Sequence, residues 1–196
     1  MLAMRHSRLA LLSIAITLGG CLPIAQERQE YDPLSNPLYA KRYYDELLEN
    51  LVSLSIYKNP ILQKKGKEKK VELSRRDAIM KAKEAEQKQR SGTKGAFIPM
   101  EEYAHGIALL DGHTIYLSSD FEVTPGISLH LFLTTAVDPR DTPFPDPDAI
   151  DFGPLQSAYG AQAFTANLPA STILYRTAVL WDTALERLVS FAQLSE

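Results

Sequence analysis

The sequence lacks the residues and motifs that would assign it to a known class of enzyme. It contains a single cysteine, Cys21, so no intrachain disulfide is possible. It has no Gly-x-Ser-x-Gly elbow, no phosphate-cradling glycine loop and no dinucleotide fingerprint. Glu101 and Glu102 are neighbours and would point to opposite faces of a strand, a poor geometry for acid–base catalysis. We therefore expect no enzymatic activity and assign no catalytic, cofactor-binding or metal-binding residue.

Positive charge is scarce in the second half of the chain. Residues 95–196 contain three Lys/Arg and thirteen Asp/Glu, whereas residues 58–94 contain thirteen Lys/Arg and five Asp/Glu. A nucleic-acid-binding protein usually carries its positive charge on the folded domain. The hydrophobic content of 45% and the mean hydropathy of −0.16 are typical of a globular protein. We therefore expect an acidic folded domain that does not bind nucleic acid.

The N-terminus has the pattern of a signal peptide over residues 1–20. Arg5, His6 and Arg8 form a short basic region, and the apolar run Leu9–Leu18 follows. This run is shorter than the roughly 20 apolar residues that a membrane-spanning helix needs. The pattern therefore predicts a segment that directs export and is then removed.

The sequence Leu18-Gly19-Gly20-Cys21 resembles the lipobox of bacterial lipoproteins. The resemblance implies cleavage before Cys21, followed by lipidation of its thiol and its new amino group with fatty acids such as palmitate. Two acyl chains on one residue anchor a protein stably, whereas one chain binds a membrane only marginally. Leu22 stands where aspartate would favour the inner membrane, so the outer membrane, facing the periplasm, is expected. An ordinary secretory signal with an incidental cysteine is the alternative.

Residues 21–36 have no sustained periodicity and are predicted to form a tether, and residues 37–91 a helical stalk. Asn36-Pro37 is a helix start signal. An apolar stripe at helical spacing then extends to Asn59-Pro60, and we expect it to pack on a second helix or on the C-terminal domain rather than on a membrane. The stripe consists of Tyr44, Leu47, Leu48, Leu51, Leu54 and Ser55.

A basic connector over residues 64–70 is predicted to lead into a second helix, Arg75–Arg90, with Ser74 and Asp77 as an approximate capping box. Ile79, Met80 and a few alanines are its residues available for burial. Favourable charge pairs four residues apart indicate a solvated spacer helix. A basic surface for lipid headgroups, polysaccharide or nucleic acid is the alternative. The pairs are Asp77–Lys81, Glu84–Lys88 and Glu86–Arg90.

Ser91–Gly95 is expected to break the helix and to mark the start of a β domain over residues 92–196. Apolar–polar alternation predicts seven or eight short antiparallel strands in a β-sandwich. The strongest β-hairpin signal is Asp120–Gly126, whose Thr-Pro-Gly would turn His113–Val123 into Ile127–Thr135. In the second of these segments, Ile127, Leu129, Leu131 and Leu133 are expected to form the apolar face that packs on the core. The remaining predicted strands are Tyr103–Leu110, which turns at Asp111-Gly112, Gln162–Asn167, Arg176–Trp181 and Leu188–Leu194.

Residues of about 92–196 resemble the DM-thirteen electron-transfer domain family, a module found beside DOMON domains. The segments that carry the resemblance are Asp120–Gly126, Leu129–Leu133, Gly153-Pro154-Leu155, Gly160-Ala161-Gln162, Leu168-Pro169 and Tyr175–Trp181. The resemblance implies a β-sandwich and a redox role that centres on a cysteine directly after the tryptophan. This chain has Asp182 at that position, and a carboxylate does not exchange with disulfides. Asp182 is expected to cap a turn, with a cation or a donor group as its alternative ligand.

Two sets of residues are candidate metal sites. His105, His113 and His130 lack the spacing of a known metal motif. The loop over residues 136–150 is rich in proline and aspartate but lacks the EF-hand pattern, so a solvated acidic loop is expected rather than a calcium site. The aspartates concerned are Asp138, Asp141, Asp146, Asp148 and Asp151.

The sequence therefore predicts a lipid-anchored protein of the bacterial cell envelope. Its β domain would serve as a non-catalytic binding or assembly module for an envelope protein or polymer. A redox or metal-dependent electron-transfer protein is the alternative that the family resemblance implies.

Overall fold

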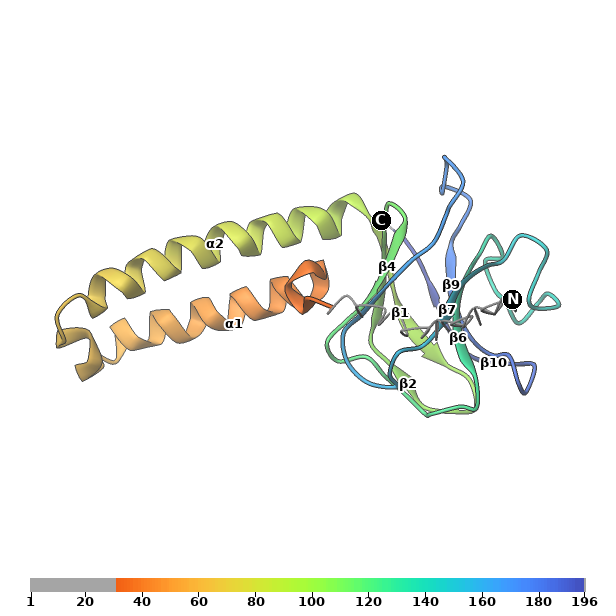
Figure 1. Cartoon of the computed structure of the whole chain (residues 1–196), viewed down its shortest axis with the longest axis horizontal. Helices are drawn as coiled ribbons and strands as arrows, with labels where there is room; N and C mark the ends of the chain where they lie inside the picture. Colours follow the sequence, from red (N-terminus) through yellow and green to blue (C-terminus); the bar gives the residue numbers. More distant parts are fainter. Residues whose placement is uncertain (1–30, 196) are drawn as a thin grey trace, which may run out of the picture. The chain divides into compact units, whose positions relative to one another are not determined.

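The computed structural model describes residues 31–195, and within them a mainly antiparallel β domain follows two helices (Figure 1). This confirms the predicted fold class. The signal peptide and Cys21 lie outside the described residues. None of the described helices is long and apolar enough to cross a membrane. The helices are η1 (Pro33–Ser35), α1 (Pro37–Ile56), η2 (Pro60–Gln63) and α2 (Lys67–Ser91). The strands are β1 (Thr93–Pro99), β2 (Ala104–His105), β3 (Ile107–Asp111), β4 (Thr114–Leu117), β5 (Glu122–Val123), β6 (Leu129–Thr134), β7 (Ile150–Pro154), β8 (Gln162–Thr165), β9 (Thr177–Asp182) and β10 (Arg187–Gln193).

Helix α1 begins at the predicted Asn36-Pro37 signal. The Asn36 side-chain oxygen accepts hydrogen bonds from the backbone N–H of Leu38 at 2.9 Å and of Tyr39 at 3.4 Å. Its amide group donates to the Leu117 carbonyl at 2.8 Å and to the Gln162 carbonyl at 3.4 Å. Asn36 is fully buried. One side chain therefore both caps α1 and fixes the base of the helices to β4 and β8.

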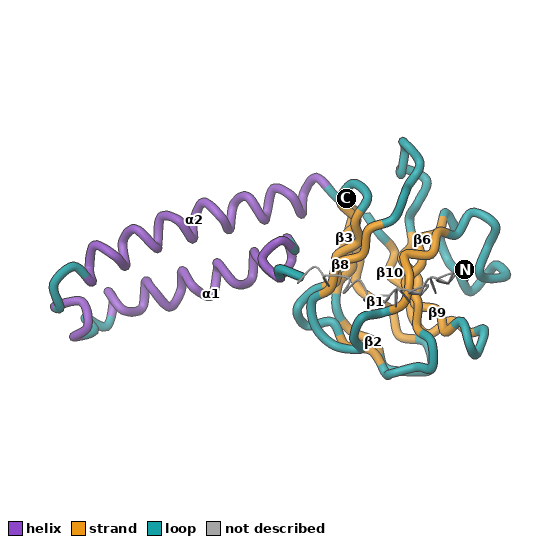
Figure 2. Tube along the Cα trace, in the orientation of Figure 1, coloured by secondary structure: helices purple, strands orange, loops and turns teal. Residues whose placement is uncertain are grey.

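Helices α1 and α2 pack against each other as an antiparallel pair, which we call the helical hairpin (residues 37–91; Figure 2). The α1 stripe faces α2, as the periodicity predicted, and most of its residues are half-buried. The buried residues of α2 are alanines: Ala78, Ala82 and Ala85. Of the residues available for burial, Ile79 and Met80 remain 39% and 57% exposed. Alanines allow the helices to approach closely, and the larger side chains fall on the solvent side.

Helix α2 begins at Lys67, eight residues before the predicted start, so the basic connector is largely helical. Gly66 precedes the helix with φ of 76°, a left-handed conformation that glycine adopts without strain. Lys and Glu, which dominate residues 67–72, are good helix formers. Ser74 consequently lies inside the helix, and the predicted capping box with Asp77 is wrong.

Eight strands form one antiparallel sheet in the order β7-β6-β9-β10-β1-β3-β4-β8, and β2 pairs with β5. The sheet curls so far that its edge strands β7 and β8 contact each other. Its two halves face each other across the main core in the manner of a sandwich. Leu131 and Leu133 of β6 are fully buried in this core, and Leu129 is 8% exposed, as the alternation predicted. The prediction is wrong for Ile127, which is 74% exposed because it lies in the loop before β6. Phe132 packs on the opposite side of the sheet with Trp181 and Phe144.

The strands on either side of Thr124-Pro125-Gly126 do not form the predicted β-hairpin. Strand β4 pairs with β3 and β8, whereas β6 pairs with β7 and β9. The segment between β4 and β6 instead crosses from one half of the sheet to the other and pairs Glu122 and Val123 with β2. The turn at Asp111-Gly112 does join paired strands, β3 and β4, as predicted.

Strand β1 occupies a central position in the sheet, although its start was expected to be a break. It pairs with β3 over Thr93–Ala96 and with β10 over Phe97–Pro99. A Cβ atom on Gly92 would lie 2.4 Å from the Leu110 carbonyl oxygen, and one on Gly95 would lie 2.0 Å from the Gln193 carbonyl oxygen. The two glycines are therefore needed for close backbone approach. Helix α2 ends at Ser91 with Gly92 as its C-cap, so the predicted helix break is confirmed.

Candidate functional site

Asp182, which the sequence resemblance aligns with a cysteine of the DM-thirteen family, is a structural residue in this chain. Its carboxylate is fully buried and accepts hydrogen bonds from the backbone N–H groups of Ile127 at 2.9 Å, Ala184 at 3.0 Å and Leu185 at 3.1 Å. Burial raises the pKa of Asp182, but the backbone N–H groups that bond to the carboxylate outweigh it, so its pKa lies below the ordinary value. The turn-capping interpretation is confirmed, and the carboxylate additionally holds a second loop.

At Gly126, the last residue of the segment Asp120–Gly126, a side chain would clash with Asp182. A Cβ atom on Gly126 would lie 2.6 Å from Asp182 Oδ2 and 2.8 Å from the Leu129 side chain. The loop before β6 therefore approaches the carboxylate as closely as a residue without a side chain allows. Gly126 thus allows the loop to pack against the end of β9.

The three histidines lie apart, each with its own partner. His105 Nε2 is 3.2 Å from an Asp120 carboxylate oxygen, and both side chains are exposed. His113 Nδ1 accepts a hydrogen bond from the Leu168 N–H at 3.2 Å. His130 Nδ1 is 2.9 Å from Asp151 Oδ2. Among the described residues, no group of three or more His, Cys, Asp or Glu is placed to hold a metal ion.

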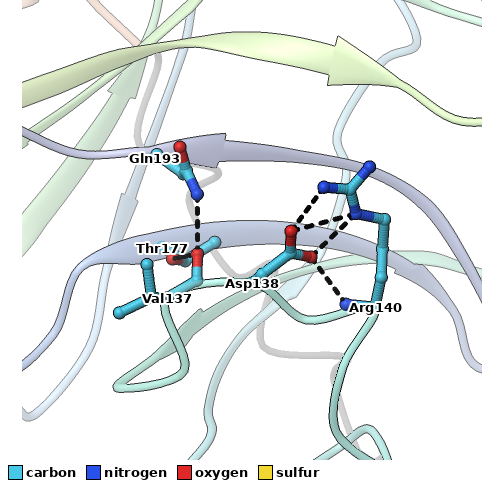
Figure 3. A network of polar contacts seen from close by, with 5 residues as sticks. All are labelled: Val137, Asp138, Arg140, Thr177 and Gln193. Atoms are coloured by element: carbon cyan, nitrogen blue, oxygen red, sulfur yellow. Dashed lines mark hydrogen bonds and ion pairs between the residues drawn. The ribbon is translucent and has the colours of Figure 1, made fainter.

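The loop over residues 136–150 is attached to the outer face of the sheet (Figure 3). The Val137 carbonyl accepts hydrogen bonds from Thr177 Oγ1 at 3.1 Å and from Gln193 Nε2 at 3.0 Å. Arg140 forms a forked ion pair with Asp138, with Nε 2.8 Å from Oδ1. Hydrogen bonds from Arg140 lower the pKa of Asp138 to about 2.

Further contacts of the loop cover part of the sheet. The Arg140 guanidinium lies 5.3 Å from the centre of the buried Phe191 ring. Phe144 packs against Phe132 and Trp181, with ring centres 5.5 and 5.1 Å away. Thr134 Oγ1 donates to Asp146. The proline- and aspartate-rich loop therefore covers the second apolar face of the sheet.

The concave feature of the β domain that suits a ligand is a cleft of about 550 Å³, a size typical of small-ligand sites. We call it the hydroxyl cleft. Four segments meet around it: the junction of α2 with β1, the turn at Gly112, the loop over residues 170–176 and the end of β10. Six hydroxyl groups and one guanidinium line it, those of Ser91, Thr93, Ser171, Thr172, Tyr175, Ser195 and Arg176.

The chemistry of the hydroxyl cleft suits binding. Hydroxyl groups donate and accept hydrogen bonds, and an arginine fork matches a carboxylate or a phosphate. Leu110 and Leu194 supply an apolar wall, and the exposed Ile173 adds apolar surface from the loop. None of the described lining residues is Asp, Glu, His or Cys, the usual general bases and nucleophiles. The cleft can therefore hold a polar, anionic ligand.

Sequence reasoning did not find the hydroxyl cleft, because its residues have no common motif or spacing. Ser91 and Thr93 belong to the predicted helix break, Tyr175 and Arg176 to a segment that carries the family resemblance, and residues 170–174 have no recognisable signal. The one usable signal was the pair Gly92 and Gly95, since glycine inside a strand indicates close approach of another backbone. The comparisons give no further guidance: no family model, no curated protein and no solved structure matches the chain.

Proposed function

We propose that this chain is a lipid-anchored protein of the bacterial cell envelope whose β domain is a non-catalytic binding module. Cys21 is the proposed site of lipid attachment. The proposed location of the protein is the periplasmic face of the outer membrane. The hydroxyl cleft is the proposed ligand site. The observation that carries the proposal is the lining of this cleft, which contains six hydroxyl groups and Arg176. None of the described lining residues is acidic, histidine or cysteine.

This lining favours a particular class of ligand. A hydroxyl-rich surface forms many weak, adaptable hydrogen bonds, which suit sugars and peptide amides. Arg176 is the single charged group among the described lining residues, and a guanidinium prefers carboxylate or phosphate. The ligand that fits both features is a carboxylate-bearing envelope polymer, with peptidoglycan as the most accessible example. An envelope protein that presents an acidic, hydroxylated segment would use the same groups.

The experiment is co-sedimentation of the full chain carrying Cys21→Ser with isolated peptidoglycan sacculi. Arg176→Ala removes the guanidinium and is expected to weaken binding about tenfold, because a hydrogen bond to a charged group contributes about 1.5–3 kcal/mol. Lys94→Ala is the matched control, since Lys94 lies on β1 with an exposed side chain and is not part of the cleft lining. Equal loss in both variants, or no loss with Arg176→Ala, contradicts the cleft as the binding site.

The alternative that the resemblance to the DM-thirteen family implies is a redox or metal-dependent protein. Thiol chemistry at position 182 would need a thiolate in place of Asp182, whose buried carboxylate is engaged by three backbone N–H groups. We therefore propose that any relationship to that family concerns the scaffold and not the chemistry. Absorbance and metal analysis of the purified chain test this, and a haem band or a stoichiometric metal would favour the alternative.

A further inference from the structure

The end of the helical hairpin that lies farthest from the β domain, residues 56–70, exposes large apolar side chains. We call this region the hairpin tip (Figure 1). Ile56 is 67% exposed, Tyr57 is 81% exposed and Ile61 is 36% exposed. A single exposed apolar side chain needs no explanation, but a group at the end of a projecting element marks an interaction surface. Aromatic and aliphatic side chains of this kind are common where a protein enters a membrane interface.

The same region is strongly basic. It contains six lysines and one acidic residue, Glu68, so its formal charge is +5. None of the six lysines forms an ion pair with another residue in the described part of the chain. The rest of α2 differs, because Lys81 pairs with Asp77 and Arg90 with Glu86. The lysines are Lys58, Lys64, Lys65, Lys67, Lys69 and Lys70.

A groove beside the hairpin tip adds a receptive surface. It has a volume of about 820 Å³ and lies between the end of α1, η2 and the first turns of α2. Lys58, Lys69, Arg75 and Arg76 contribute cationic groups to its lining. Glu68 and Glu72 also line it, and Glu72 pairs with both arginines, so the net charge of the described lining is positive. The Arg75 Nε atom is buried and has no hydrogen-bond partner among the described residues. A buried donor of this kind is costly unless a ligand satisfies it, and a phosphate oxygen would do so.

We propose that the hairpin tip docks on the surface of an anionic phospholipid bilayer. The lysines face the headgroup phosphates, one phosphate enters the groove at Arg75, and Ile56 and Tyr57 enter the interface between headgroups and acyl chains. The exposed apolar side chains favour a bilayer over a soluble polyanion as the partner. A soluble polyanion would bind the lysines alone, whereas a bilayer also buries apolar side chains. This contact is separate from lipidation at Cys21 and from the hydroxyl cleft, and so it is independent of the proposed function.

The test uses the full chain carrying Cys21→Ser, so that no lipid anchor contributes. Binding is measured to vesicles of phosphatidylcholine alone and of phosphatidylcholine mixed with phosphatidylglycerol. We expect binding that requires phosphatidylglycerol and that weakens as salt is added. Lys64→Glu with Lys65→Glu should weaken it about tenfold or more. Lys83→Glu with Lys88→Glu makes the same charge change nearer the base of the hairpin and should have a much smaller effect.

A second pair of measurements separates a bilayer from a free polyanion. Ile56→Ser with Tyr57→Ser should reduce binding to the anionic vesicles and leave binding to soluble polyphosphate unchanged. Both changes are at exposed sites, and thermal unfolding checks that the variants fold. The proposal is overturned if vesicle binding is insensitive to these two apolar substitutions, if the two lysine pairs have equal effects, or if neutral vesicles bind equally well.

Discussion

Asp182 accepts a hydrogen bond from the backbone N–H of Ile127 at 2.9 Å, across 55 positions of sequence. The same carboxylate caps the turn that follows β9. Asp182→Ala should destabilise the protein by about 1–3 kcal/mol, because the backbone N–H groups that bond to the carboxylate lose their partner. The cost stays within this range because water can replace the carboxylate at the N–H groups of exposed residues. Urea unfolding measures the change. The exposed Asp148 supplies the control, and a loss no greater than that of Asp148→Ala would refute the structural role of Asp182.

The pH dependence of stability follows from the same carboxylate. The pKa of Asp182 is lower in the folded protein than its ordinary value, so the folded state binds fewer protons than the unfolded state there. The stabilisation is fully present above the unfolded pKa of about 3.9 and is lost as the pH falls through the lower, folded pKa. Asp182→Asn should therefore reduce the loss of stability in acid. Unfolding free energies measured from neutral pH down to pH of about 3 test this, and an unchanged acid dependence would contradict it.

Asn36 joins the helical hairpin to the β domain, and its removal should be more costly than the loss of an ordinary cap. Asn36→Ala removes a cap and leaves the Leu117 and Gln162 carbonyls without this donor, at an expected cost of about 2–3 kcal/mol. Asn59 caps η2 through the Ile61 N–H alone, so Asn59→Ala should cost about 1 kcal/mol or less. Hydrogen exchange in the first turn of α1 should speed up in the first variant. Equal costs would show that the buried bonds add nothing.

The signal-like N-terminus predicts lipid attachment at a single residue. Cells that produce the full chain and are fed labelled palmitate should incorporate the label, and Cys21→Ser should abolish it. The thiol and the new amino group of Cys21 are the proposed acceptors, and two chains give the stable anchoring that one does not. Label that survives the substitution would place the attachment elsewhere and remove the basis for the proposed localisation.

Local patterns were sufficient where the structure depends on neighbours in sequence. Asn36-Pro37 starts α1, Asp111-Gly112 joins β3 to β4, and the alternation Leu129–Leu133 places three leucines in the core. Each of these features is decided within a few residues, by capping, by turn geometry or by the two-residue period of a strand. The prediction of a mainly antiparallel β fold rested on such signals and is confirmed.

Long-range pairing could not be predicted in the same way. The segment after β4 has the alternation of a β-hairpin, but β4 and β6 find other partners far away in sequence. The central position of β1 depends on its pairing with β10, at the other end of the chain. The hydroxyl cleft depends on the same closure, which brings Thr93 near Arg176 and Ser195. For the hairpin tip, the sequence showed the basic residues, and the structure adds the exposure of Ile56 and Tyr57 beside them.

The central claim is that the β domain binds a carboxylate-bearing envelope polymer in the hydroxyl cleft. The most direct measurement is a titration of the isotopically labelled full chain carrying Cys21→Ser with soluble sugar–peptide fragments of peptidoglycan, followed by amide NMR signals. We predict saturable shifts for residues of the cleft, such as Thr93 and Thr172, that Arg176→Ala removes. Shifts confined to other parts of the molecule, or no shifts at saturating fragment concentration, would contradict the claim.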